Sequence, residues 1–182
     1  MKKFMAISLM VCSFISCNSS TEPKTEGTEP ATATTPAVTN TAIDLPFKAS
    51  YSSNFTTDVS DADLKTVLDS YVHWRSGDID KLAGVMGDTA TIELADGTIK
   101  VFSNSDLKAY WKLHRDSIAS VDINMEAWQK LHSDKGDDIV LTWYIEKDTY
   151  KTGKVDSAYY HDINIIKNGK ITLYSTYKKP KK

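Results

Sequence analysis

The feature that most constrains the fold is a change in the spacing of apolar residues near position 120. Before it, apolar residues such as Leu64, Val67 and Tyr71 recur every three or four positions, which is the spacing of an amphipathic helix. After it, Val121 and Ile123 begin an alternation of apolar and polar residues, which is the spacing of a half-buried strand. A chain in which helices precede long strands is typical of an α+β domain, in which the helices cover one face of an antiparallel sheet.

Local capping signals place the ends of the helices. Ser60 is followed three residues later by Asp63, and Ser103 is followed by Asp106, so each serine is expected to cap the first turn of a helix. The Ser-Gly-Asp sequence at 76–78 ends the first of these helices and begins a second, short one. We therefore predict three helices, beginning just after Ser60, at residue 79 and just after Ser103.

Strands are predicted where branched and aromatic residues alternate with polar ones. Helical spacing extends the short second helix to Met86 and the third helix to Ile118. A tight turn is predicted at Asp96-Gly97. The predicted strands are 89–94, 99–102, 121–127, 139–148, 156–167 and 171–177.

The Asn168-Gly169 pair is the strongest turn signal in the chain. A type I′ turn needs positive φ at both central residues, which Asn and Gly adopt more readily than other residues. With a two-residue loop Lys167 faces Lys170, and counting outward puts one set of side chains on each face of the hairpin. One set is His161, Ile163, Ile165, Tyr174 and Thr176, and the other is Asp162, Asn164, Ile166 and Ser175. Both sets mix polar and apolar residues, so alternation alone does not say which face is covered.

Three segments together resemble the nuclear transport factor 2-like superfamily, in particular its SnoaL-like members. They are YVHWRSGDIDKL at 71–82, DTATI at 88–92 and INIIKNGKI at 163–171. The resemblance covers about residues 60–179, and we assign residues 60–182 to this domain. It implies a cone-shaped, curled antiparallel sheet wrapped over three helices and enclosing a pocket. The superfamily also commonly forms homodimers through the outer face of the sheet.

The resemblance also implies which residues line that pocket. Steroid-isomerase relatives carry an acidic pocket residue at the position that matches His161 by its distance from the turn. The face that carries His161 and Tyr174 is therefore expected to line the pocket. Tyr71 would meet this face from the first helix, and Trp111 and His114 from the third. A histidine and a tyrosine there can exchange protons or hold a ligand oxygen, whereas the alternative is a hydrogen-bonded core histidine beside a core tyrosine.

One position departs from the isomerase pattern. Isomerase relatives carry their catalytic carboxylate where this chain has Leu94, and the pleat aims the neighbouring Glu93 at the opposite face. The histidines show no metal-ligand spacing, and we expect neither a metal nor a cofactor. We expect a domain that binds a small, largely apolar ligand, without assured catalysis. The alternatives are an isomerase, cyclase or dehydratase that uses His161 and Tyr174, and an interaction module that dimerises through the outer sheet face.

The N-terminus carries a secretory signal. Two lysines, at positions 2 and 3, precede an apolar stretch at 4–15, which is shorter than the roughly 20 residues of a membrane-spanning helix. The sequence Phe-Ile-Ser-Cys at 14–17 resembles a bacterial lipoprotein box, with Phe14 where Leu is usual. The resemblance implies a signal peptide at residues 1–16, cleavage before Cys17 and a membrane anchor through lipidation of Cys17.

Composition describes the segments between the anchor and the domain. Residues 17–44 are rich in Thr, Pro and Glu and are expected to form a disordered tether, and residues 45–59 a surface segment. The formal charge of −2 gives no reason to expect a nucleic-acid partner. The signal peptide and the lipoprotein box imply that the protein is located in the bacterial cell envelope. Asn18 and Ser19 stand where an Asp retains some lipoproteins at the inner membrane, which favours the outer membrane.

Overall fold

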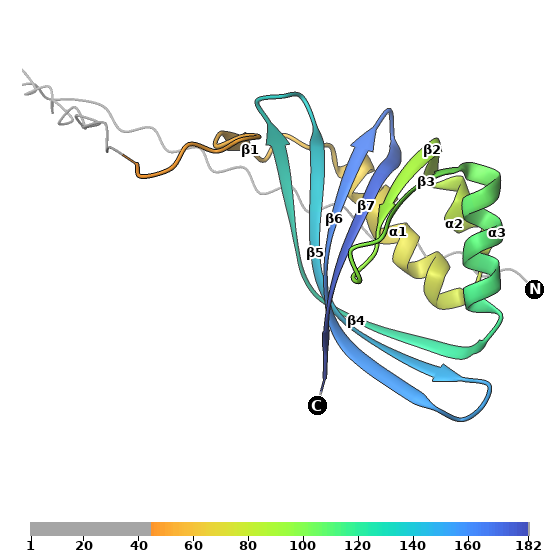
Figure 1. Ribbon diagram of the computed structural model, residues 1–182. Coiled ribbons are helices and arrows are strands. Elements are labelled where there is room, and N and C mark those ends of the chain that lie inside the picture. The colour runs from red at the N-terminus through yellow and green to blue at the C-terminus, as the bar shows by residue number, and fades with distance from the viewer. Residues whose placement is uncertain (1–44, 182) are drawn as a thin grey trace, which may run out of the picture. The chain divides into compact units, whose positions relative to one another are not determined.

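The computed structural model describes residues 45–181, which form three helices and one sheet of seven strands (Figure 1). The predicted signal peptide, Cys17 and the tether lie outside the described residues. Within the described residues, no helix is both long enough and apolar enough to cross a membrane.

The three helices begin at the predicted caps. They are α1 (Asp61–Ser76), α2 (Ile79–Gly84) and α3 (Asn104–Arg115). The Ser60 hydroxyl accepts a hydrogen bond from the Asp63 N–H at 3.0 Å, and the Ser103 hydroxyl accepts one from the Asp106 N–H at 3.2 Å. Gly77 ends α1 with φ +77°, a left-handed conformation that favours glycine. The serine caps and the glycine stop are confirmed.

The strands form one mostly antiparallel sheet in the order β1-β4-β5-β6-β7-β2-β3. Their bounds are β1 (Phe55–Thr56), β2 (Met86–Glu93), β3 (Ile99–Ser103), β4 (Ile118–Ser133), β5 (Asp138–Tyr150), β6 (Val155–Lys167) and β7 (Lys170–Pro180). Strand β2 pairs with β7 in parallel, and all other neighbours pair antiparallel. Met86 and Ile118, which helical spacing assigned to helices, instead begin β2 and β4, because α2 and α3 end earlier than the spacing predicted.

The turn between β6 and β7 has the predicted form. Asn168 and Gly169 have φ of +52° and +73°, and Lys167 pairs with Lys170. These positive φ values at both central residues are those of a type I′ turn, which matches the right-handed twist of the strands. The loop length and the first pair of the hairpin are therefore confirmed.

The register of this hairpin shifts a few residues from the turn. Ile166 pairs with Ile171 but Ile165 pairs with Leu173, which leaves Thr172 as an extra residue in β7. His161 consequently pairs with Tyr177 rather than with Thr176, so the predicted pairing is wrong by one residue. Because the side-chain period of a strand is two, a one-residue shift in β7 changes which residues of the two strands share a face.

The sheet curls around the helices, which all lie on its concave side (Figure 1). The core joins α1, α3 and the sheet through side chains that are almost completely buried, among them Val67, Leu107, Val140 and Ile171. The far halves of β4, β5 and β6 bend beneath the helices and extend beyond this core (Figure 1). This bend leaves the space between helices and sheet only partly filled by core side chains.

Candidate functional site

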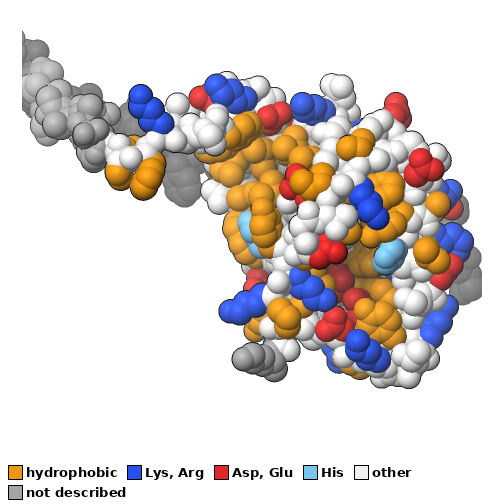
Figure 2. Space-filling view, in the orientation of Figure 1, with side chains coloured by type: hydrophobic (Ala, Val, Ile, Leu, Met, Phe, Trp, Pro, Cys, Tyr) orange, Lys and Arg blue, Asp and Glu red, His pale blue; other side chains and the backbone are white. Residues whose placement is uncertain are grey.

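A cavity of about 350 Å³ lies between the helices and the concave face of the sheet. Its lining comes from α1, α2 and α3 and from β5, β6 and β7, and it combines aromatic and aliphatic side chains with a few polar ones. In Figure 2 the surface of the domain is hollowed, and acidic and hydrophobic side chains are visible inside the hollow. Pockets for small organic ligands commonly have this size and this kind of lining.

A buried hydrogen-bond network forms the floor of the cavity. The Tyr71 hydroxyl, on α1, donates to Asp162 Oδ2 at 2.9 Å and lies 2.6 Å from Thr142 Oγ1. The Tyr144 hydroxyl donates to the same oxygen of Asp162 at 2.9 Å. Asn164 Nδ2 donates to the Tyr71 oxygen at 3.4 Å. The network ties α1 to β5 and β6, and so fixes the helix over the sheet.

Burial shifts the pKa values of the ionisable groups in this network and so determines which of them hold a proton at neutral pH. Asp162 is completely buried, and burial raises the pKa of its carboxyl, while hydrogen bonds from Thr176, Tyr71 and Tyr144 act in the opposite direction. Burial also raises the pKa values of the Tyr71, Tyr144 and Tyr174 hydroxyls well above their ordinary value. All three tyrosines therefore keep their protons at neutral pH, and they supply hydrogen-bond donors at the floor of the cavity.

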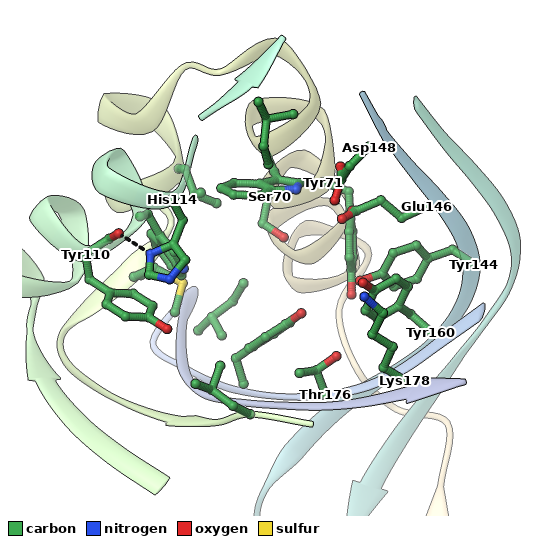
Figure 3. Close-up of a pocket in the computed structure, with 18 of the residues that line it drawn as sticks. Ser70, Tyr71, Tyr110, His114, Tyr144, Glu146, Asp148, Tyr160, Thr176 and Lys178 are labelled. Carbon is green, nitrogen blue, oxygen red and sulfur yellow. Dashed lines mark hydrogen bonds between the residues drawn. The ribbon is translucent and has the colours of Figure 1, made fainter. Parts of the chain in front are cut away.

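One wall of the cavity carries two carboxyl groups. Glu146 and Asp148 lie two residues apart on β5, so both point to its concave face, and each is 9% exposed. Burial, and then the charge of Asp148, raise the pKa of Glu146 to about 8, against the effect of a hydrogen bond from Trp74. Burial also raises the pKa of Asp148, against the charge of Lys178. Figure 3 shows the two side chains next to each other on the wall opposite His114.

The nearest cationic side chains are engaged elsewhere. Lys178 Nζ forms an ion pair with Asp156 at 2.8 Å. The Arg115 guanidinium donates to three backbone carbonyl groups, those of Trp74, Arg75 and Ile118. Across residues 45–181 no basic side chain forms an ion pair with either wall carboxyl.

The opposite wall belongs to α3. Its His114 side chain is exposed, and its Nδ1 lies 2.8 Å from the Tyr110 carbonyl oxygen (Figure 3). The two rings also pack against each other, with their centroids 4.2 Å apart. Trp111 lines the cavity from the same helix. Figure 3 shows His114 and Tyr110 across the cavity from the wall carboxyls.

Four of the five residues predicted to line the pocket do line it: Tyr71, Trp111, His114 and Tyr174. His161 is the exception, and its predicted place is corrected. Its ring stacks on Trp143, with the centroids 4.7 Å apart, and it pairs across the strands with Tyr177, whose side chain is 56% exposed. The extra residue in β7 puts Tyr174 and Thr176 on the concave face with Asn164 and Asp162, and His161, one position from Asp162 in β6, lies on the convex face instead of sharing a face with Tyr174.

The sequence interpretation missed the wall carboxyls. The signal that could have found them is the alternation at 142–148, where Thr142, Tyr144, Glu146 and Asp148 occupy every second position between larger apolar residues and Lys147. Such polar alternation usually marks a solvent-facing side of a strand. Here the curl of the sheet covers that side with helices.

The position that departs from the isomerase pattern also faces the cavity. Leu94 is part of the lining, whereas Glu93 is not. No three His, Cys, Asp or Glu side chains gather as ligands for a metal ion anywhere in the part of the chain that the structure describes.

Comparisons by sequence identify no relative: no protein-family model matches the chain, and no curated protein matches it. Solved structures do resemble it. A candidate polyketide cyclase from Xanthomonas campestris pv. campestris has 16% identity and a TM-score of 0.52, and the match covers 64% of this chain and 89% of that one. An LEH-like epoxide hydrolase from M. tuberculosis has 13% identity and a TM-score of 0.55, with 65% and 83% of the chains covered.

A third structure is a nuclear transport factor 2-like protein of unknown function from Exiguobacterium sp. 255-15. It has 18% identity and a TM-score of 0.52, and the match covers 64% of this chain and 98% of that one. At such low sequence identity, the similarity of this chain to the three structures is a similarity of fold. Together with the curled sheet over three helices, it shows that residues 45–181 adopt the cone-shaped α+β fold of the nuclear transport factor 2-like proteins.

Proposed function

We propose that the domain binds a small, largely apolar molecule inside the cone. The observation that carries this proposal is the cavity of about 350 Å³, whose lining combines aromatic and aliphatic side chains with a few polar groups. Binding sites for small molecules usually have such a preformed apolar cavity with a few convergent polar atoms. The fold is one that polyketide cyclase-like and epoxide hydrolase proteins also have, which is compatible with either binding or catalysis.

Thr176 offers a place for an oxygen or nitrogen atom of the ligand. Its side chain lines the cavity next to Asp162, its partner across β6 and β7, and a hydrogen bond from its hydroxyl lowers the pKa of that carboxyl. The hydroxyl oxygen can still accept a hydrogen bond, so a ligand group that donates to it would gain affinity. The ligand is therefore expected to carry one polar group on an apolar body.

Blocking the cavity tests the proposal. Ser70 lines the cavity from α1, so Ser70→Phe would place a ring in the space that a ligand needs. With 2-naphthylmethanol as a neutral probe, we expect saturable binding to the unchanged protein and at least about tenfold weaker binding to the variant. Isothermal titration calorimetry measures both constants. Ser120→Phe, at an exposed position of β4, is the matched control and should bind as the unchanged protein does.

Acid–base catalysis of the isomerase, cyclase or dehydratase type is a second candidate function. The observation that favours it is Glu146, whose pKa of about 8 lets it accept or donate a proton near neutral pH while it lines the cavity. His161 no longer supports this candidate, because it lies on the convex face. Turnover that is lost in Glu146→Gln and kept in the exposed variant Glu126→Gln would distinguish catalysis from binding.

Association of two copies through the convex face is a third candidate. Tyr159 and Tyr177 lie there 40% and 56% exposed, next to the stacked rings of Trp143 and His161. Exposed aromatic groups on a sheet face favour a partner over open solvent.

We further propose that the protein acts at the bacterial cell envelope, anchored through a lipid on Cys17. The support is the leader at residues 1–16 and the lipoprotein-like Phe-Ile-Ser-Cys sequence that ends at Cys17. The residues that follow Cys17 favour the outer membrane. A domain held at a membrane surface meets the apolar molecules that partition there, which fits the proposed ligand class.

Cys17→Ala is expected to abolish lipid attachment, because it removes the thiol that would carry the lipid. Labelling cells with an alkyne fatty acid and fractionating their membranes would show the loss as an unlabelled protein outside the membrane fraction. Cys12→Ala is the control, because Cys12 lies within the leader, and it should leave labelling unchanged. A Cys17→Ala protein that still carries the label would refute the anchor.

A further inference from the structure

The wall formed by Glu146 and Asp148 is unusual because it is buried and no cationic side chain among the described residues forms an ion pair with it. Asp148 is only 9% exposed, it lines the cavity, and its Oδ1 has no hydrogen-bond partner among the described residues. Glu146 lies two residues away on the same face of β5, and Figure 3 shows both carboxyl groups at the same wall of the cavity. Burying a charged group without a partner is costly, so a carboxylate in this wall is stabilised by a cation that binds against it.

The protein supplies no such cation in contact with them. Lys178, the nearest lysine in the lining, is held by Asp156 at 2.8 Å, and its Nζ lies 5.5 Å from the centre of the Tyr160 ring. The N–H groups of Arg115 are used by backbone carbonyls. Lys178 and Arg115 therefore influence the two carboxyl groups only by long-range electrostatic attraction and not by direct contact.

Aromatic side chains surround the same end of the cavity. Trp74, Tyr150 and Tyr160 all line it. A hydrogen bond from Trp74 acts on the pKa of Glu146, and the charges of Glu146 and Asp148 act on the pKa of Tyr150, so these rings lie beside the carboxyls. Aromatic faces attract ammonium groups, and together with carboxylates they form the usual recognition site for organic cations.

We propose that the ligand of this cavity carries a protonated amine, which binds between Glu146 and Asp148, and an apolar body that lies toward Leu82, Met86 and Ile171. This inference rests on the proposed ligand-binding function and adds the chemical class of the ligand. The three aliphatic side chains line the cavity together with the carboxyls, so one amphipathic molecule can meet both groups. An anionic ligand would meet repulsion at the wall, and a neutral one would leave the carboxyls unpaired.

Because the charge of the two wall carboxyls depends on pH, the affinity for an amine should depend on pH as well. The groups that act on Glu146 are Asp148 on its own strand, Trp74 on α1, Asp162 on β6 and Lys178 on β7, while Asp156 and Arg115 act on Asp148. In the free protein Glu146 keeps its proton up to a pH of about 8, and a bound ammonium favours the carboxylate. Binding below pH 8 should therefore release a proton. The affinity for an amine should rise as the pH approaches 8 and fall again at higher pH, where the amine itself loses its proton.

A matched set of probes tests the inference. They are 2-naphthylmethylamine, 2-naphthylmethanol and 2-naphthoate, which share a ring system and differ in charge. At pH 8, calorimetry in a buffer free of amines should show the amine binding at least about tenfold more tightly than the alcohol, with the carboxylate weakest. Between pH 6.5 and 8 the amine affinity should rise about tenfold while the alcohol affinity stays constant. This comparison uses the unchanged protein and does not depend on the folding of a variant.

Two variants test whether the preference for the amine comes from Glu146 and Asp148. Glu146→Gln and Asp148→Asn should each weaken amine binding about tenfold and leave alcohol binding unchanged, which also reports that the cavity is intact. The exposed variant Glu126→Gln makes the same charge change outside the cavity and should bind the amine as the unchanged protein does.

The outcomes separate the two proposals. If the alcohol binds as tightly as the amine, or if the carboxylate binds best, the cation inference is wrong and the cavity remains a ligand site. If the amine preference survives in both wall variants, the assigned residues are wrong. If none of the three probes binds, the proposed ligand-binding function itself fails.

Discussion

Glu146→Gln is expected to make the domain more stable at alkaline pH, by about 5 kcal/mol at pH 9. The pKa of Glu146 is raised from 4.5 to about 8 in the folded protein, chiefly by burial. Each pKa unit corresponds to about 1.4 kcal/mol, so ionising this group in the folded state opposes folding on the order of 5 kcal/mol. Glutamine keeps the shape of the protonated side chain and never ionises, so the variant does not bear this cost.

The sign follows from which state holds the proton. Between pH 4.5 and 8 the unfolded chain has lost the Glu146 proton and the folded protein still binds it. The free energy of unfolding of the unchanged protein therefore falls as the pH rises through this window, and it becomes level above it. At pH 4.5 and below the variant and the unchanged protein should be equally stable.

Urea denaturation at pH 4.5, 7 and 9 measures the difference. Acetate, phosphate and borate buffers cover the three pH values and avoid primary amines, which would occupy the proposed site. The charges of Asp148 and Asp162 help to raise the pKa of Glu146, so the three carboxyls titrate as a coupled group, and the difference between the two proteins measures the effect of removing Glu146 from that group. The exposed variant Glu126→Gln should follow the unchanged protein at every pH. If the free energy of unfolding depends on pH in the same way in Glu146→Gln and in the unchanged protein, Glu146 titrates normally and the prediction is wrong.

Local signals in the sequence predicted most of the architecture. The serine caps, the Gly77 stop and the Asn168-Gly169 turn depend on a few neighbouring residues, and the structure has them where they were expected. The order of helices and strands predicted an α+β domain, and the resemblance to the nuclear transport factor 2-like superfamily implied the cone. Parallel pairing of β2 with β7 was not predicted, because it joins strands far apart in the chain and leaves no local pattern.

The candidate site was harder to predict because its geometry depends on one extra residue. The bulge in β7 at Thr172 has no sequence signal, since the flanking residues read as an ordinary strand. That residue decides whether Tyr174 and Thr176 share a face with His161, as predicted, or with Asp162, as the structure has it. Glu146 and Asp148 were missed for a different reason, because only the curl of the sheet shows that their side of β5 is covered.

Tyr71→Phe is expected to cost about 3 kcal/mol of stability and to lower the melting temperature on the order of 10 °C. The change removes one oxygen and leaves the ring, so packing is preserved. The lost hydroxyl donates to Asp162 at 2.9 Å and lies 2.6 Å from Thr142 Oγ1 and 3.4 Å from Asn164 Nδ2. These three partners are completely buried, so water cannot replace the lost bonds without opening the interface between α1 and the sheet.

Tyr177→Phe is the matched control, since it removes the same atom from a side chain that is 56% exposed on the convex face. It should change stability by less than about 0.5 kcal/mol. Thermal denaturation followed by circular dichroism compares the two variants directly. Equal losses would mean that the Tyr71 hydroxyl does not hold the helix to the sheet. A large loss in Tyr71→Phe alone would show that the hydrogen bonds of the Tyr71 hydroxyl, and not only the packing of its ring, join α1 to β5 and β6.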